Sequence, residues 1–241
     1  MKTDTTTGLF GLDTDRKQSR IVIQPVPWEV TTSYGSGTSR GPNAILEASS
    51  QLDLFDIELG EMYKVGYHLE PLDLDMQKEN DRLKKLAGQV LEEWDEFGET
   101  KDSVKPWIAD INRGCEKMVQ TVYARTQSVL AEGKIPGLVG GDHSSPLGSI
   151  QAISENLRGD FGVLHVDAHA DLRLAYQGYT HSHASIMRNV MLLKTPPKKL
   201  VQVGIRDFCK EEYDFIQESE GRIQTFFDEK LKTRLLEGES W

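Results

Sequence analysis

The sequence predicts an α/β fold in which helices cover both faces of a mostly parallel sheet. Short apolar runs recur along the chain, and segments with apolar residues at helical spacing separate them. Strands that alternate with helices in this way form parallel sheets. Two of the runs end in clusters of acids and histidines, GGDHSS and DAHAD. Because ligands bind outside the carboxyl ends of parallel strands, we expect a polar site at that edge of the sheet.

Each expected element follows from a local pattern. The strands are expected at residues 21–26, 64–69, 135–139, 161–166, 200–205 and 222–227. A helix is expected after Pro42, because proline suits the first turn of a helix. Residues 79–94 carry apolar side chains at helical spacing, and further helices are expected at 115–130 and within GSIQAISENL and EEYDFIQES. The charged residues 95–105 are expected to form a loop.

The chain is expected to contain one domain. Residues 1–19 are polar and predict a mobile N-terminal arm. Residues 20–241 show no repeat and no change of composition that would indicate a boundary, and 241 residues suit one large α/β domain.

Composition and charge exclude several classes of function. The net charge of −10 argues against general binding to nucleic acid or to anionic membranes, and it is compatible with a small cationic substrate. No apolar run has the length of a signal peptide core or a membrane span. Cys115 and Cys209 form no disulfide framework or metal spacing, so we expect a cytoplasmic protein in which both are small buried residues.

Asp167, His169 and Asp171 alternate directly after an apolar run. In an extended backbone such residues point the same way, so their side chains can converge on one small volume. Carboxylates with imidazole suit Mn²⁺, Zn²⁺ or Fe²⁺, and the share of carboxylates favours Mn²⁺. His143, after two glycines, could supply a fourth ligand. The alternative is that these residues are polar strand ends hydrogen-bonded to loops.

GGDHS and DAHAD together resemble the first two motifs of the ureohydrolase superfamily of arginases, agmatinases and formimidoylglutamases. The similarity continues upstream in YGSGTSRGPNAILEAS and downstream in THSHAS and VGIRD, and the upstream loop is most similar to the agmatinase branch. The resemblance implies a three-layer α/β/α sandwich and two Mn²⁺ ions sharing a hydroxide that attacks a guanidinium carbon. It implies hydrolysis of agmatine to putrescine and urea, with arginase, guanidinobutyrase or formimidoylglutamase activity as alternatives.

The same resemblance assigns roles by motif. It implies that His143 and Asp171 ligate one ion, that His169 ligates the other, and that Asp167 bridges both. His183 in SHAS matches the family's proton-shuttling histidine, whereas His181 is expected to be a loop histidine. His165, inside the expected strand, is interpreted as a core histidine, and Asp142 as a residue that orients the ligands or caps the next helix.

One family motif has no counterpart. The third motif, SxDxDxxDP, supplies two further metal ligands, and the chain ends at EGESW without it. Four of six ligands are therefore expected, and the strands between the GGDHS and DAHAD strands are expected to be missing. We expect an incomplete ureohydrolase or, as an alternative, a truncated non-catalytic relative. Family members are commonly trimers or hexamers, which implies a homo-oligomer.

Two rival functions rest on the segment GTSRG. It fits the G-x-S-x-G pattern of serine hydrolases, with Ser39 as nucleophile, but VTTSYG is a poor strand to precede it. The same segment nearly matches the GxGxxG of dinucleotide-binding folds, with one residue too many. We consider both weaker than the metal site.

Overall fold

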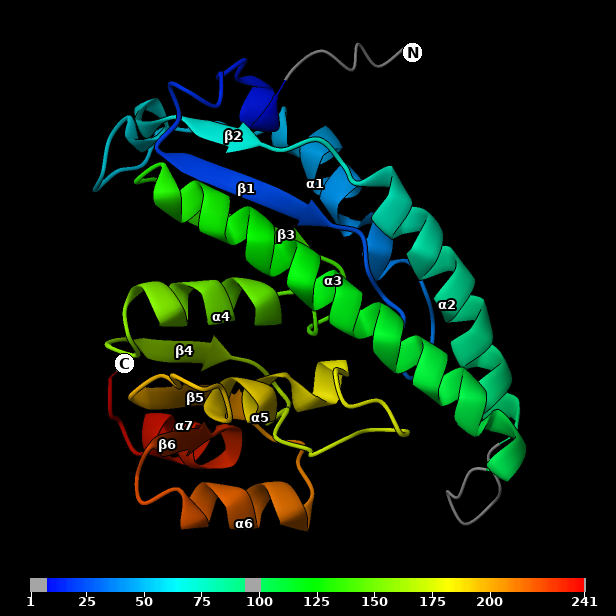
Figure 1. The fold of residues 1–241 in the computed structure, drawn as a ribbon. Helices are drawn as coiled ribbons and strands as arrows, with labels where there is room; N and C mark the ends of the chain where they lie inside the picture. The colour runs from blue at the N-terminus through cyan, green and yellow to red at the C-terminus, as the bar shows by residue number, and fades with distance from the viewer. Residues whose placement is uncertain (1–7, 94–100, 241) are drawn as a thin grey trace. The chain divides into compact units, whose positions relative to one another are not determined.

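Six strands form two parallel sheets of three strands each, in a computed structural model that describes residues 8–93 and 101–240. The strands are β1 (Ile21–Val26), β2 (Tyr67–Leu69), β3 (Ile135–Gly140), β4 (Gly162–Val166), β5 (Lys199–Ile205) and β6 (Ile223–Phe227) (Figure 1). They fall close to the six predicted segments, and the α/β class with parallel pairing is confirmed. The chain divides into two compact units, Met1–Ser149 and Ile150–Trp241, which are described separately below.

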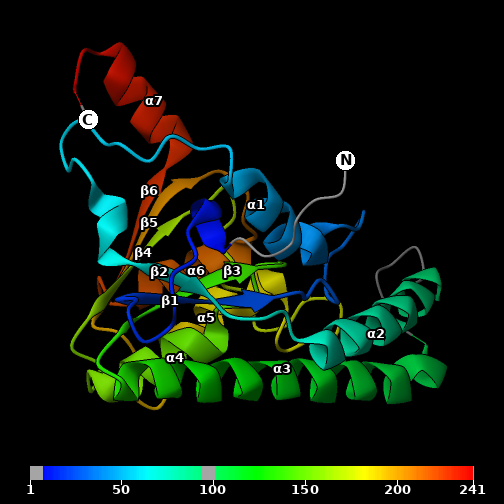
Figure 2. The same cartoon turned by 90° about the horizontal axis from the view of Figure 1, so that it is seen from above.

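The first unit contains the sheet β2-β1-β3. The central strand β1 pairs with both neighbours in parallel, and Val22 and Val26 on it are almost completely buried. Helices α1 (Gly41–Ser49), α2 (Leu74–Glu92) and α3 (Lys105–Ala131) belong to this unit. Figure 2 shows α2 and α3 lying side by side. Asp73 begins α2, because its carboxylate accepts the backbone N–H groups of Asp75 and Met76.

The helix α3 is longer than the sequence predicts. The sequence predicts a helix over residues 115–130, whereas the helix begins ten residues earlier, at Lys105. In the structure Gly114 is buried inside α3, and a side chain there would collide with Leu83 of α2. The glycine therefore allows the two helices to approach closely. Pro106, in the first turn, begins the helix instead.

The N-terminal segment makes specific contacts where it is described. Residues 1–7 of the predicted arm lie outside the described residues. Leu9 is buried, Phe10 stacks edge-on against Tyr67 with ring centroids 5.4 Å apart, and Arg16 forms ion pairs with Glu70 and Glu132. Residues 8–19 therefore pack on the first unit.

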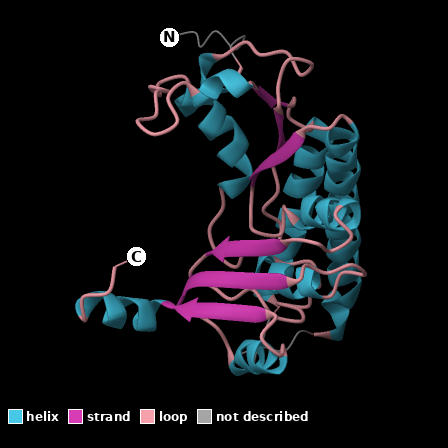
Figure 3. Cartoon of the chain, turned by 90° about the vertical axis from the view of Figure 1, so that its left-hand side faces the viewer, coloured by secondary structure: helices cyan, strands magenta, loops and turns pink. Residues whose placement is uncertain are grey.

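The second unit contains the sheet β4-β5-β6, whose three arrows run side by side in the same direction in Figure 3. Leu200, Gln202 and Ile205 of β5 are completely buried. Helices α5 (Ile186–Met191), α6 (Lys210–Glu218) and α7 (Asp228–Leu236) lie in this unit, and α4 (Leu147–Asn156) spans the boundary at Ser149. The sequence analysis identifies the segments of α4 and α6 but not α5 or α7.

Within residues 8–93 and 101–240, five short 3-10 helices connect these elements: Leu9–Gly11, Thr38–Arg40, Met62–Val65, Asp102–Val104 and His183–Ser185. The strand expected at 64–69 begins only at Tyr67, because residues 64 and 65 belong to the 3-10 helix Met62–Val65. Of the expected loop at 95–105, residues 95–100 lie outside the described residues, Asp102–Val104 forms a 3-10 helix, and Lys105 begins α3.

Both strands that precede the acid and histidine clusters are edge strands. In the described part of the chain β3 pairs only with β1, and β4 pairs only with β5. None of the described helices is long and apolar enough to cross a membrane.

Candidate metal centre

Glycine shapes the loop that follows β3. Gly141 has a positive φ of 59°, and a side chain on it would collide with the carbonyl oxygens of Trp28 and Val26. Only glycine has no such penalty at this position. The tight loop places Asp142 and His143 directly after the strand end.

Asp142 stabilises its own loop. It is 6% exposed, its carboxylate accepts the backbone N–H of Ser144 at 2.9 Å, and the Thr31 hydroxyl lies 3.2 Å from it. Its backbone N–H donates to Trp28 O at 2.7 Å. The expectation that Asp142 orients the loop fits these bonds. His143, the next residue, is half-buried in the first unit.

The second loop, residues 167–171, is only partly extended. The strand β4 ends at Val166, and the backbone of Asp167 still bonds Val203 O at 3.1 Å. Asp171 then adopts a left-handed conformation with φ 52°. Its carbonyl oxygen accepts the N–H groups of Met187 and Arg188 at 3.0 and 3.2 Å, which holds this conformation.

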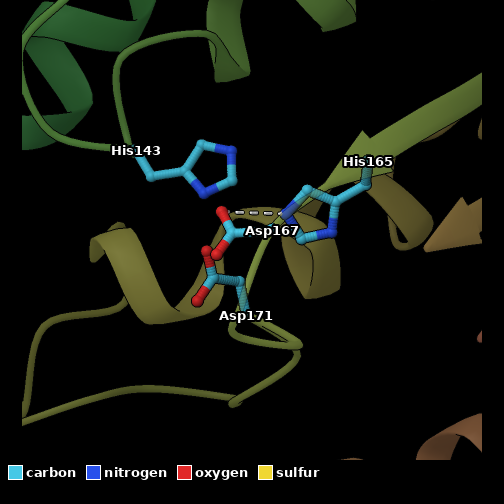
Figure 4. A group of neighbouring side chains, drawn as sticks. All are labelled: His143, His165, Asp167 and Asp171. Atoms are coloured by element: carbon cyan, nitrogen blue, oxygen red, sulfur yellow. Dashed lines mark ion pairs between the residues drawn. The ribbon is translucent and has the colours of Figure 1, made fainter. Parts of the chain in front are cut away.

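Asp167 and Asp171 converge within the second unit. Each offers an oxygen, and His165 offers a ring nitrogen, within 4.8 Å of one another (Figure 4). His165 and Asp171 are 4% and 5% exposed. The convergence of the two aspartates agrees with the alternating pattern, whereas the nearby histidine is His165.

The hydrogen bonds of Gln202 identify the tautomer of His165. The Gln202 amide donates to Ala170 O at 2.7 Å, and its oxygen accepts the Thr225 hydroxyl at 2.9 Å, so its Nε2 is the NH₂ group. That group lies 3.0 Å from Nδ1 of His165, which must therefore accept. The ring proton is then on Nε2, 3.3 Å from Asp167 Oδ2.

A protonated ring nitrogen cannot ligate a metal. In this tautomer His165 would act on the site through its 3.3 Å contact with Asp167. The interpretation of His165 as a core histidine fits this arrangement. The sequence gives no sign of Gln202, because a glutamine in an apolar strand has no motif of its own.

His169 lies on the outside of the loop. Its side chain is 60% exposed, with Nδ1 3.4 Å from Asp167 Oδ1 and Nε2 3.7 Å from Asp207 Oδ2. The ring is thus beside Asp167 but outside the group formed by His165, Asp167 and Asp171. Its role as a metal ligand stays a prediction.

The remaining histidines lie in the segment after the loop. His183 begins a short 3-10 helix, is half-buried, and meets the edge of Tyr176 with ring centroids 5.7 Å apart. His181 Nδ1 lies 3.2 Å from the Thr180 hydroxyl. The predicted proton-shuttling role of His183 stays a prediction.

Glu212 is a second residue whose role no sequence motif predicts. It is 2% exposed and comes from α6, yet its Oε1 accepts the N–H of Leu172 at 2.9 Å. Its other oxygen accepts the N–H of Cys209 at 2.8 Å and so closes the first turn of α6. Cys209, at this helix start, is only half-buried, although both cysteines are expected to be buried. Cys115 is fully buried as expected, and burial raises the pKa of its thiol.

The segment GTSRG is organised by a buried acid. Glu29 accepts the N–H groups of Gly37 at 2.6 Å and Ser39 at 2.9 Å, and the Thr38 hydroxyl at 3.1 Å. Burial alone would raise the pKa of Glu29, but these hydrogen bonds and the charge of Lys84 outweigh it, so the pKa is lowered. Residues 27–37 contain no strand, so the strand–turn–helix needed for a Ser39 nucleophile is absent there.

The donor set in the second unit fits a divalent cation. Carboxylate oxygens with imidazole nearby suit Mn²⁺ among the common metals. A buried carboxylate such as Asp171 is costly unless it is paired or bound to a metal. Asp167, which is half-buried, lies close to it, and two carboxylates so close together favour a cation between them.

Comparison with known proteins agrees with the motifs. The sequence profile of the Arginase family matches residues 19–237. A Synechocystis protein named N(1)-aminopropylagmatine ureohydrolase is 31% identical over 208 residues, covering 85% of this chain and 56% of that protein. A Thermus thermophilus protein of the same name is 35% identical over 196 residues, covering 80% and 53%. The chain thus spans about half the length of these relatives.

Solved structures show the same fold. The agmatine ureohydrolase of Thermoplasma volcanium has a TM-score of 0.63 at 20% identity, covering 91% of this chain and 61% of that one. The arginase from Medicago truncatula has a TM-score of 0.66 at 21% identity, covering 91% and 59%. The profile match over most of the sequence, the identity to the ureohydrolases and the paired aspartates after β4 together show that this chain belongs to the arginase family.

Proposed function

We propose that this chain provides part of a two-manganese site that hydrolyses the C–N bond of a linear guanidino compound. The observation that carries the proposal is the convergence of the Asp167 and Asp171 carboxylates in a chain of the arginase family. In this proposal the Asp167 and Asp171 carboxylates would hold the manganese. His143 and His169 are assigned as further ligands from their motifs.

A divalent cation held there would lower the pKa of a water molecule and so provide a nucleophile near neutral pH. In this proposal the chain's own residues have the other roles. His165 orients Asp167 through the Nε2 proton, and Gln202 holds His165. The water oxygen adds to the guanidinium carbon, the bond from that carbon to the alkyl nitrogen breaks, and the products are urea and an amine.

The departing alkyl nitrogen needs a proton, and His183 is the proposed donor. A histidine can hold and release a proton near neutral pH. Tyr176 packs edge-on against the His183 ring, and the guanidinium of Arg173 lies 5.1 Å from the Tyr176 ring centroid. These contacts restrict the ring to few orientations, as a proton donor requires.

Agmatine and N(1)-aminopropylagmatine are the proposed substrates. The names of the relatives from Synechocystis and Thermus thermophilus support the longer compound, and the upstream loop supports the agmatinase branch. Both compounds are cations, which suits the net charge of −10. A cytoplasmic location and a trimeric or hexameric assembly stay predictions.

The test compares Asp171→Asn with Glu29→Gln, which changes a buried acid of the other unit. After incubation with Mn²⁺ and dialysis, metal content is measured by mass spectrometry, and urea release is measured with both proposed substrates and with arginine. We expect Asp171→Asn to weaken Mn²⁺ binding more than about 100-fold, because it removes a charged ligand. Glu29→Gln should keep the metal.

Equal manganese content in wild type and Asp171→Asn would contradict the assigned site. Manganese without urea from any guanidino compound would contradict the activity and favour a non-catalytic relative.

A further inference from the structure

A pocket of about 470 Å³ lies at the carboxyl ends of β5 and β6 in the second unit. We call it the aromatic pocket, and its main lining residues are Arg206, Phe208, Tyr213, Phe227, Asp228 and Lys230. The strand β5 ends at Ile205 and β6 ends at Phe227, so the lining follows directly from the two strand ends. This is the edge at which parallel sheets bind ligands, and the mechanism above uses none of these six residues.

Three aromatic rings gather in the pocket. The Phe208 and Phe227 centroids are 5.0 Å apart, Phe208 and Tyr213 are 6.2 Å apart, and Tyr213 and Phe227 are 6.4 Å apart. Phe208 and Tyr213 remain 37% and 42% exposed. Exposed aromatic faces attract cations through the negative charge above the ring, and grouped rings are a common receptor for ammonium groups.

The pocket already receives an ammonium group. Nζ of Lys230 lies 5.9 Å from the centroid of Phe227. Lys230 is exposed, and its long side chain can leave this position without disturbing the fold. Lys230 therefore marks the place that an ammonium ion would take, and it competes for that place.

The acidic residues that line the pocket also suit a cation. Asp228 and Glu229 form the first turn of α7, and Asp228 is ion-paired with Lys232 at 2.7 Å. The opposing charge of Arg206 is directed to a backbone oxygen, Gly204 O, at 3.3 Å. Aromatic faces together with these carboxylates favour an alkylammonium group over an anion.

The pocket is tied to the loop that carries the paired aspartates. The backbone N–H of Arg206 donates to Ala168 O at 2.8 Å, and Ala170 N donates to Asp207 O at 3.3 Å. His169 and Asp207 form a parallel bridge, and their side chains are 3.7 Å apart. Phe208 therefore follows directly on a segment that is hydrogen-bonded to residues 168–170.

We propose that the aromatic pocket binds the far ammonium group of a guanidino-polyamine whose guanidinium lies at Asp167 and Asp171. The inference rests on the proposed function and narrows its substrate. A compound with an aminopropyl extension beyond the four-carbon chain of agmatine has a second amine to place in the pocket. Agmatine itself has only one, so the longer compound is preferred.

Binding of spermidine to the metal-free protein tests the pocket separately from the metal site. Spermidine carries alkylammonium groups but no guanidinium, and the protein is treated with EDTA before calorimetric titration. We expect Phe227→Leu and Phe208→Leu to weaken binding at least about threefold, as loss of a cation–π contact predicts. Lys230→Gln should strengthen binding by a similar factor, because a competing cation is removed.

Phe55→Leu is the matched control, since Phe55 is 71% exposed in the first unit. It should leave the affinity for spermidine unchanged. Equal affinity in Phe227→Leu and Phe55→Leu, or no binding of spermidine by the wild type, would overturn the inference. Lys230→Gln keeps the test decisive if a phenylalanine variant fails to fold, because weaker or unchanged binding there also overturns it.

Substrate preference gives a second measurement. The ratio of kcat/KM for N(1)-aminopropylagmatine to that for agmatine should fall at least about threefold in Phe227→Leu. An unchanged ratio in an active enzyme would reject the pocket while leaving the hydrolase intact. Absence of urea with intact spermidine binding would reject the proposed function and leave the pocket.

Discussion

The loops after β3 and β4 use a buried aspartate in opposite ways. Asp142 in the first loop and Asp171 in the second are similarly buried, at 6% and 5% exposure. The Asp142 carboxylate accepts hydrogen bonds from its own loop and from Thr31. In Asp171 the backbone carbonyl accepts the structural bonds, and the carboxylate lies beside Asp167.

The two loops differ in how they are held. The first loop is held by a glycine that permits tight packing and by its own acid. The second receives hydrogen bonds from neighbouring elements, from Gln202 of β5 and Glu212 of α6. A buried aspartate in such a loop can therefore play different structural parts, which residue type alone does not reveal.

The largest effect is expected for Gly141→Ala in the first loop. The new side chain would collide with the Trp28 and Val26 carbonyls at a positive φ, so we expect a loss of about 3–5 kcal/mol in the free energy of unfolding. Gly133→Ala is the control, with a positive φ but open space, and should cost about 1–2 kcal/mol. Urea denaturation measures both, and equal losses would show that packing around Gly141 is unimportant.

The next effect tests whether Gln202 of β5 supports the second loop. Gln202→Leu removes the donor to His165 and to Ala170 O, so Mn²⁺ affinity should fall about 10–100-fold. Electron paramagnetic resonance measures the free Mn²⁺, and nitrogen NMR of the metal-free protein reports the tautomer. The exposed Gln224→Leu is the control. A wild-type His165 protonated on Nδ1 would disprove the arrangement.

The smallest effect concerns Glu29. Its pKa is lowered in the folded protein, so its stabilisation is complete above the unfolded pKa and is lost as the pH falls through the folded value. Glu29→Gln should therefore cost about 1 kcal/mol at pH 7, and the difference from wild type should vanish in acid. A difference that is constant from pH 7 to pH 3 would show that charge plays no part.

Local patterns were sufficient to predict the strands and the pairing of the aspartates. Apolar runs predict β1 and β3 to β6 within a few residues, although the edge strands β3 and β4 are partly exposed rather than buried on both faces. The alternation predicts that Asp167, His169 and Asp171 converge. The two aspartates do, but the His169 side chain is 60% exposed and lies outside their group, because the strand stops at Val166 and Asp171 turns left-handed.

Long-range contacts account for what the sequence does not reveal. Gly114 allows the close approach of α3 to Leu83 of α2, a contact that no local pattern reveals. Gln202 and Glu212 act on residues 32 and 40 positions away, so no local pattern identifies them. The helix α5 has only six residues, too few to show a helical period, and the charged helix α7 has no buried residue, so the sequence predicts neither.

The close approach of α2 and α3 at Gly114 has a consequence for how the first unit unfolds locally. Because Leu83 fills the space where a side chain would otherwise stand, neither α2 nor α3 can move away without exposing the other's apolar surface. The two helices should therefore unfold locally as one cooperative block, and their backbone amides should share one common level of protection from hydrogen exchange.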